Sequence, residues 1–124
     1  MPEPTSATTC ASATTCASAE PIRLLLMTCP QDQVTGMLDT LLRERLIACG
    51  NVIAGVASRY WWQGALCSDS EALVVMETAT SRVAAAMQRI AALHPYSVPK
   101  ILAFAPMLGH AEYVDWVLES TRPD

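Results

Sequence analysis

Apolar residues near the start of the chain follow two different patterns. Residues 22–27 form a short apolar block that precedes Pro30, which is typical of a buried strand. Farther on, apolar side chains recur at three- and four-residue spacing along one helix face: Val34, Met37, Leu38, Leu41, Leu42 and Leu46. This spacing predicts an amphipathic helix, which Gly50 is expected to end.

The middle of the chain is rich in residues that favour strands. Residues 52–62 and 71–78 predict two strands joined at Gln63-Gly64, because glycine adopts positive φ without steric cost. The rest of the chain predicts three further elements: a helix from Thr80 or Ser81 to Pro95, a strand over residues 99–107 and a helix over residues 110–120.

This order of elements predicts an α+β fold. Strand, helix, strand, strand, helix and strand describe a ferredoxin-like βαββαβ arrangement, here with an extra C-terminal helix. Both helices should cover one face of an antiparallel sheet, leaving the other face to alternate apolar with polar residues. The predicted strands are instead apolar on both faces, since Leu73 and Val75 alternate with Val74 and Met76. A second copy of the chain would cover the remaining face, so we expect a homo-oligomer.

The first residues have a different composition. Residues 6–11 and 12–17 both read SATTCA, a repeat without bulky apolar side chains. Such a segment cannot offset the entropy lost on ordering. We therefore expect residues 1–20 to be a disordered low-complexity tail and residues 21–124 to form the folded domain. The segment lacks the basic start and apolar stretch of a secretory signal.

Charge and cysteine content narrow the class of protein. The formal net charge is −4, and Lys100 is the single lysine, which argues against nucleic acid as a partner. No apolar stretch approaches the ~18 residues of a membrane-spanning helix, so no membrane partner is expected. Five cysteines with irregular spacing resemble neither a disulfide framework nor a zinc site. Reduced thiols and a cytoplasmic location follow as expectations.

Five short motifs, in register over residues 22–119, resemble those of the CutA divalent-cation tolerance proteins. They are RLIACGN at residues 45–51, YWWQG at 60–64, HPYSVPKI at 94–101, TCP at 28–30 and YVDWV at 113–117. The resemblance implies a homotrimer of ferredoxin-like subunits whose long hairpins pair edge to edge. It also implies a role in tolerance of copper and other divalent metals, binding of such ions, and no established catalytic activity.

Three departures from the family pattern concern charge. Family members often carry an acidic residue where this chain has Lys100, and another where it has Ser97. A lysine that is common near the end of the third strand is also absent, where the chain has Met76-Glu77-Thr78. An ammonium in place of a carboxylate removes a cation ligand and adds repulsion. Any ion site built on these positions is therefore in question.

Three residues are candidate metal ligands. Cys29 follows the first strand, and His94 lies where a ferredoxin-like sheet can bring it near that loop. Thiolate and imidazole suit copper(II), zinc(II) and related ions, so we expect weak binding of a divalent metal by this pair. Cys49, at the end of the first helix, is either a third ligand or a buried apolar residue. For His94 the alternative is a helix-ending residue hydrogen-bonded to backbone.

The remaining functional alternatives are a ligand cleft and an enzyme. Trp61 and Trp62 should point to opposite faces of one strand, either packing against a partner subunit or lining an intersubunit cleft. A second functional hypothesis is a trimeric signalling module similar to the PII proteins, binding a small anionic ligand or nucleotide between subunits. No hydrolase, zinc-protease or phosphate-loop motif is present. A Cys–His dyad would lack an orienting carboxylate, so we do not expect an enzyme.

Overall fold

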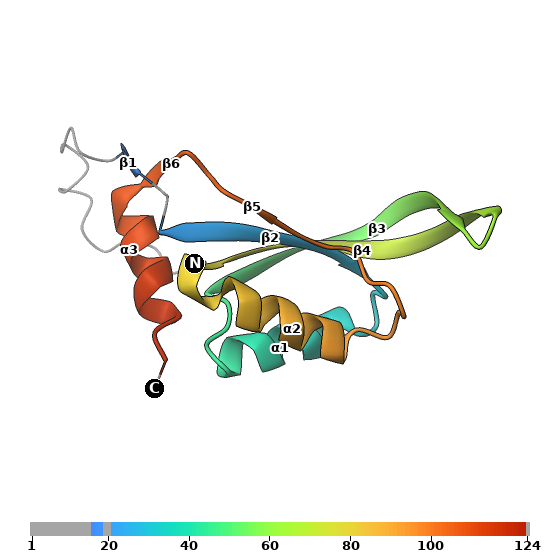
Figure 1. Ribbon diagram of the computed structural model, residues 1–124, viewed down its shortest axis with the longest axis horizontal. Coiled ribbons are helices and arrows are strands. Elements are labelled where there is room, and N and C mark those ends of the chain that lie inside the picture. The colour runs from blue at the N-terminus through green and yellow to red at the C-terminus, as the bar shows by residue number, and fades with distance from the viewer. Residues whose placement is uncertain (1–15, 19–20, 124) are drawn as a thin grey trace.

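The computed structural model describes residues 16–18 and 21–123 (Figure 1). Four strands form one antiparallel sheet in the order β3-β4-β2-β5, and β1 and β6 form a separate pair. The predicted α+β arrangement with a C-terminal helix is confirmed. Its elements are β1 (Cys16–Ser18), β2 (Ile22–Cys29), α1 (Val34–Arg43), β3 (Cys49–Trp62), β4 (Ala65–Ala79), the 3₁₀ turn η2 (Thr80–Arg82), α2 (Val83–Leu93), β5 (Ile101–Phe104), β6 (Leu108–His110) and α3 (Ala111–Ser120).

Helices α1 and α2 lie side by side on one face of the sheet (Figure 1). Their apolar stripes bury against the inward side chains of β2 and β4, as the helical spacing predicts. The main core includes Leu25, Met27, Val74, Met76, Leu41 and Ile90. A smaller cluster lies under α3 and comprises Ile22, Ala48, Val114 and Val117. The main core therefore lies between the sheet and helices α1 and α2, and the smaller cluster lies at the end of the sheet next to α3.

The end of α1 differs from the sequence prediction. The helix stops at Arg43, and Arg45 takes a positive φ of 60° before the chain turns into β3. Gly50, predicted to end the helix, lies within β3 instead. A Cβ at this position would lie 2.7 Å from the Leu38 Cδ2 atom, so the glycine permits close approach of the helix to the strand. The prediction mistook a packing glycine for a helix-ending one.

Strands β3 and β4 form a long hairpin that projects from the body of the molecule (Figure 1). Its turn is Gln63-Gly64, as predicted, and both residues have positive φ. Where the hairpin leaves the body, the β3–β4 register shifts between Ile53 and Val56, and Gly55 takes a φ of +70°. The Gly55 N–H donates to Gln31 Oε1 at 2.8 Å, and Gln31 Nε2 donates to Ser70 Oγ at 3.3 Å. The β2–α1 loop therefore holds both strands at the bulge.

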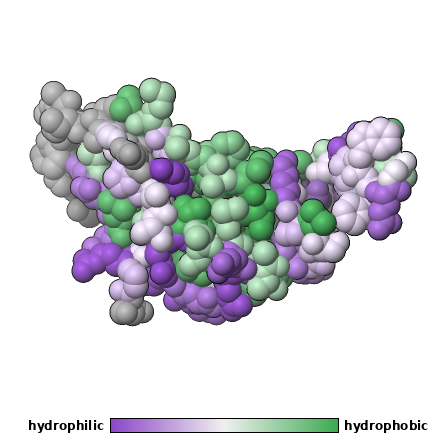
Figure 2. Space-filling view, in the orientation of Figure 1, coloured by the Kyte–Doolittle hydropathy of each residue, from purple (hydrophilic) through white to green (hydrophobic). Residues whose placement is uncertain are grey.

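The sheet face opposite α1 and α2 is apolar and largely uncovered. On β2, Leu26 pairs with Val75 of β4 and with Leu102 of β5. Two residues earlier on the same face, Leu24 pairs with Phe104 of β5. Leu102 and Phe104 are exposed, and Leu24, Leu26 and Val75 are half-buried. Hydrophobic side chains gather over the middle of the molecule in Figure 2, where β2 and β5 lie in Figure 1. The sequence prediction of strands that are apolar on both faces holds for this part of the sheet.

The two ends of the chain also differ from expectation. Within the tail predicted to be disordered, residues 16–18 form β1, which hydrogen-bonds to β6 through backbone groups and so needs no bulky side chains. Residues 1–15 and 19–20 of that predicted tail lie outside the described residues. The last predicted strand is shorter than residues 99–107, since β5 is confined to Ile101–Phe104.

Among the described residues, no helix has the length and apolarity needed to span a membrane.

Candidate functional site

His94 lies at the end of β2, in contact with the residue directly before Cys29. Cys29 ends β2, and His94 follows the last residue of α2. The His94 Nε2 atom donates to the backbone carbonyl of Thr28 at 2.7 Å, so the imidazole contacts the residue directly before Cys29. His94 Nδ1 in turn accepts the Tyr96 backbone N–H at 3.2 Å. The imidazole thereby ties the end of α2 to the end of β2.

These contacts do not fit a metal ligand pair as they stand. A carbonyl partner requires the proton on Nε2, and an N–H partner requires the lone pair on Nδ1, so both ring nitrogens of His94 are engaged. Cys29 is 0% exposed, and its thiol pKa is raised first by burial and then by the Glu71 carboxylate. Among the described residues, no group of three or more histidine, cysteine or acidic side chains is arranged to hold a metal. The Cys29–His94 ligand pair stays a prediction.

Sequence reasoning missed the carboxylate of this cluster. Glu71, on β4, is 5% exposed, and the Tyr96 hydroxyl donates to its Oε2 atom at 2.8 Å. Burial, followed by the hydrogen bond to Glu71, raises the pKa of Tyr96 above its ordinary value of 10.0. Its burial had no signal in the sequence, because Glu71 ends a polar run at residues 68–71, directly before the apolar run 72–76. The cluster thus contains a thiol, an imidazole, a carboxylate and a phenol.

Cys49 belongs to a different part of the sheet. It pairs with Glu77, whereas Cys29 pairs with Ala72, which places the two thiols about 16 Å apart along β4. Burial first, and the Glu77 carboxylate second, raise the pKa of the Cys49 thiol. The Tyr113 hydroxyl donates to Glu77 Oε1 at 2.6 Å, which fastens α3 to this end of the sheet. Cys49 therefore cannot complete a site with Cys29 and His94 within one chain.

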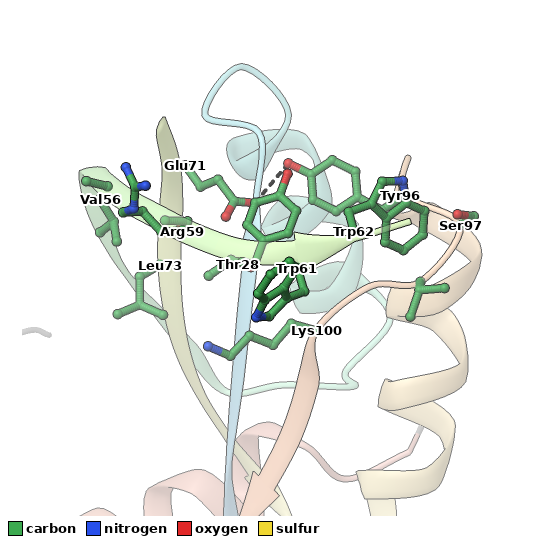
Figure 3. Close-up of a pocket in the computed structure, with 14 residues that line it drawn as sticks. Thr28, Val56, Arg59, Trp61, Trp62, Glu71, Leu73, Tyr96, Ser97 and Lys100 are labelled. Carbon is green, nitrogen blue, oxygen red and sulfur yellow. Dashed lines mark hydrogen bonds between the residues drawn. The ribbon is translucent and has the colours of Figure 1, made fainter. Parts of the chain in front are cut away.

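A pocket of about 770 Å³ opens beside the Cys29–His94 cluster (Figure 3). The hairpin supplies Trp61 and Trp62, and the segment after α2 supplies Tyr96. The pocket is also lined by Ser97 and Lys100. These residues stand where family members often have acidic side chains, so the expected acidic residues are replaced at this pocket. The volume suits a small organic molecule. Trp61 and Trp62 both line this pocket, and both are exposed in the single chain.

The class of protein follows from the fold and from sequence comparison. A four-stranded antiparallel sheet with two helices on one face defines a ferredoxin-like α+β protein, and the family model "CutA1 divalent ion tolerance protein" matches residues 23–120. The chain belongs to the CutA1 divalent ion tolerance family. The family predicted from the sequence motifs is confirmed.

Individual relatives agree with this assignment. The divalent-cation tolerance protein CutA of Thermus thermophilus is 39% identical over 99 residues, which cover 79% of this chain and 96% of that protein. The chloroplastic protein CutA 1 of Oryza sativa is 35% identical, covering 67% of this chain and 47% of that longer protein. The crystal structure of CutA from Xylella fastidiosa matches with a TM-score of 0.80 and 32% identity, covering 82% of this chain and 99% of that one.

These names bear on the functional hypotheses. The family and its relatives are named for tolerance of divalent cations and not for an enzymatic reaction. The comparisons give no support to the alternative of a PII-like signalling module. A role connected with divalent cations is therefore the function that the family assigns to this chain.

Proposed function

We propose that this protein is a cytoplasmic homotrimer that contributes to divalent-cation tolerance by binding copper(II) or another divalent ion weakly and reversibly. The observation that carries the proposal is the hydrogen bond of His94 to the backbone directly before Cys29, in a chain of this family. Cys29, Cys49 and Cys67 are free thiols, which supports a reducing compartment.

The uncovered sheet face supports the assembly. Leu102 and Phe104 project from β5 beside half-buried leucines of β2, on the face that neither α1 nor α2 covers. Apolar side chains that cluster on one exposed face mark an interaction surface, and an identical copy presents a matching one. The edge strand β3 has a further row of backbone groups that another hairpin can pair with. Three copies would cover these surfaces together.

The contacts of the cluster support weak binding. An incoming cation needs a lone pair on His94 and a thiolate on Cys29. It must therefore displace a hydrogen bond worth about 1 kcal/mol and a proton from a thiol of raised pKa. The buried Glu71 carboxylate attracts positive charge to the same place. These opposing contributions favour an affinity low enough for the ion to be released again.

Calorimetric titration with copper(II) and zinc(II) tests the proposal. Wild-type protein should bind, and Cys29→Ala and His94→Ala should each weaken binding by about tenfold or more, because each removes one ligand. Cys67→Ala is the matched control, since it removes a thiol from the hairpin, away from the cluster. Absence of heat with the wild type, or equal losses in Cys29→Ala and Cys67→Ala, would overturn the ion site.

A further inference from the structure

The pocket beside the cluster contains two positive charges that the proposed ion site does not use. Arg59 of β3 and Lys100, which precedes β5, line it together with Glu71. Neither cation forms a hydrogen bond or ion pair with another described residue. Figure 3 shows the charged ends of Arg59 and Lys100 on the side of the pocket opposite Trp62. Both positive groups are therefore available to a ligand.

The negative group of the pocket is built in more firmly. Glu71 is buried, and its Oε2 atom accepts the Tyr96 hydroxyl. No described residue donates to its Oε1 atom, and that atom is not fully buried. A charged acceptor that is open to the pocket can accept a hydrogen bond from a donor group of a ligand. Oε1 is therefore the natural position for a positively charged donor group.

The walls between these charges are aromatic and aliphatic. Trp61 and Trp62 come from the end of β3, and Leu73 comes from β4. Both tryptophans are exposed in the chain, and Figure 3 shows them around the opening that the charged side chains border. Aromatic faces bind apolar side chains by burial and also attract cations. The pocket thus combines an apolar wall with one acidic and two basic groups.

We propose that this pocket binds a small zwitterion of the amino-acid class with an apolar or aromatic side chain. Its ammonium group would donate to Glu71, its carboxylate would meet Lys100 and Arg59, and its side chain would lie on the tryptophans. A ligand with only a negative charge would face the Glu71 carboxylate, and one with only a positive charge would face two cations. This inference goes beyond the proposed cation function, since it uses neither Cys29 nor His94.

Three probes that share a phenylethyl skeleton test the charge pattern on metal-free full-length protein. L-phenylalanine carries both charges, phenethylamine only the ammonium, and 3-phenylpropionate only the carboxylate. Tryptophan fluorescence and calorimetry should detect binding of L-phenylalanine, with each analogue weaker by about tenfold, the loss of one charged hydrogen bond. Equal binding of all three probes, or no binding of L-phenylalanine, would overturn the proposal.

Two substitutions assign the charges to residues. Glu71→Gln should weaken L-phenylalanine about tenfold without weakening 3-phenylpropionate, because glutamine still accepts the Tyr96 hydroxyl. Lys100→Met should weaken L-phenylalanine without weakening phenethylamine. Glu112→Gln, an exposed position on α3, is the matched control. If Glu71→Gln does not fold, Lys100→Met decides alone, since Lys100 is exposed. Loss of binding in Glu112→Gln equal to that in Lys100→Met would contradict the proposal, while the cation titration remains a separate result.

Discussion

Truncation of the uncovered sheet face should dissociate the proposed trimer. Leu102 and Phe104 are 47% and 48% exposed in the single chain. Full burial of such a side chain contributes about 1.5–3 kcal/mol, so covering the exposed half contributes about 1 kcal/mol. The double variant Leu102→Ala/Phe104→Ala in three protomers therefore removes about 6 kcal/mol from the assembly. This corresponds to roughly 20,000-fold in the dissociation constant, and to roughly 140-fold in the protomer concentration at half dissociation.

Sedimentation velocity over a range of protein concentrations measures that shift. Wild-type protein should remain trimeric at concentrations where the double variant is monomeric, and circular dichroism should show that the variant keeps its fold. Leu42→Ala provides a control, because Leu42 is an exposed leucine on α1, away from the uncovered face. Wild-type protein that sediments as a monomer at micromolar concentration would refute the reasoning. So would a double variant that dissociates no sooner than Leu42→Ala.

Three further predictions concern the cluster, the hairpin and α3. The affinity for copper(II) or zinc(II) should increase with pH, because the Cys29 thiol must lose its proton to bind the ion. Burial and the Glu71 carboxylate raise the pKa of this thiol above 9.0. Calorimetry in buffers of different ionisation enthalpy measures the proton release, and an affinity that does not change with pH contradicts the prediction. Gln31→Ala removes two hydrogen bonds of about 1 kcal/mol each, so the backbone amides of the hairpin should exchange hydrogen faster. The control is Gln88→Ala at an exposed position, and equal exchange in the two variants would show that Gln31 does not hold the hairpin. Tyr113→Phe leaves buried Glu77 without its donor and should lower the unfolding free energy by about 1–3 kcal/mol in denaturant titrations; an unchanged midpoint argues against this role.

Local periodicity was sufficient to predict most of the fold. The apolar spacing of α1 and the turn at Gln63-Gly64 are properties of neighbouring residues, so the sequence displays them directly. The role of Gly50 depends on Leu38, which approaches it only after the helix packs on the sheet. The β1–β6 pair depends on backbone hydrogen bonds between distant segments, which side-chain composition does not reveal. Sequence reasoning therefore erred where tertiary contacts decide the outcome.

The approach of His94 to the end of β2 could be predicted from the sequence, and its hydrogen bonds could not. The expectation that the loop after the first strand approaches His94 follows from topology, and the hydrogen bond to Thr28 agrees with it. The engagement of both imidazole nitrogens depends on atomic positions around α2 and could not be derived from spacing. Glu71 was missed because its partner Tyr96 is 25 positions away and joins it only across the folded sheet.

The contact between Gln31 and the hairpin has a mechanical consequence. Gln31 lies two residues after Cys29, and its amide grips the bulge where β3 leaves the body. The end of β2, where we propose that an ion binds, is therefore linked to the root of the projecting arm through a few residues and one side chain. Only the residues between Cys29 and Gln31 and one hydrogen bond to Gly55 separate that thiol from the root of the hairpin, so a change at Cys29 has a short covalent and hydrogen-bonded path to the arm.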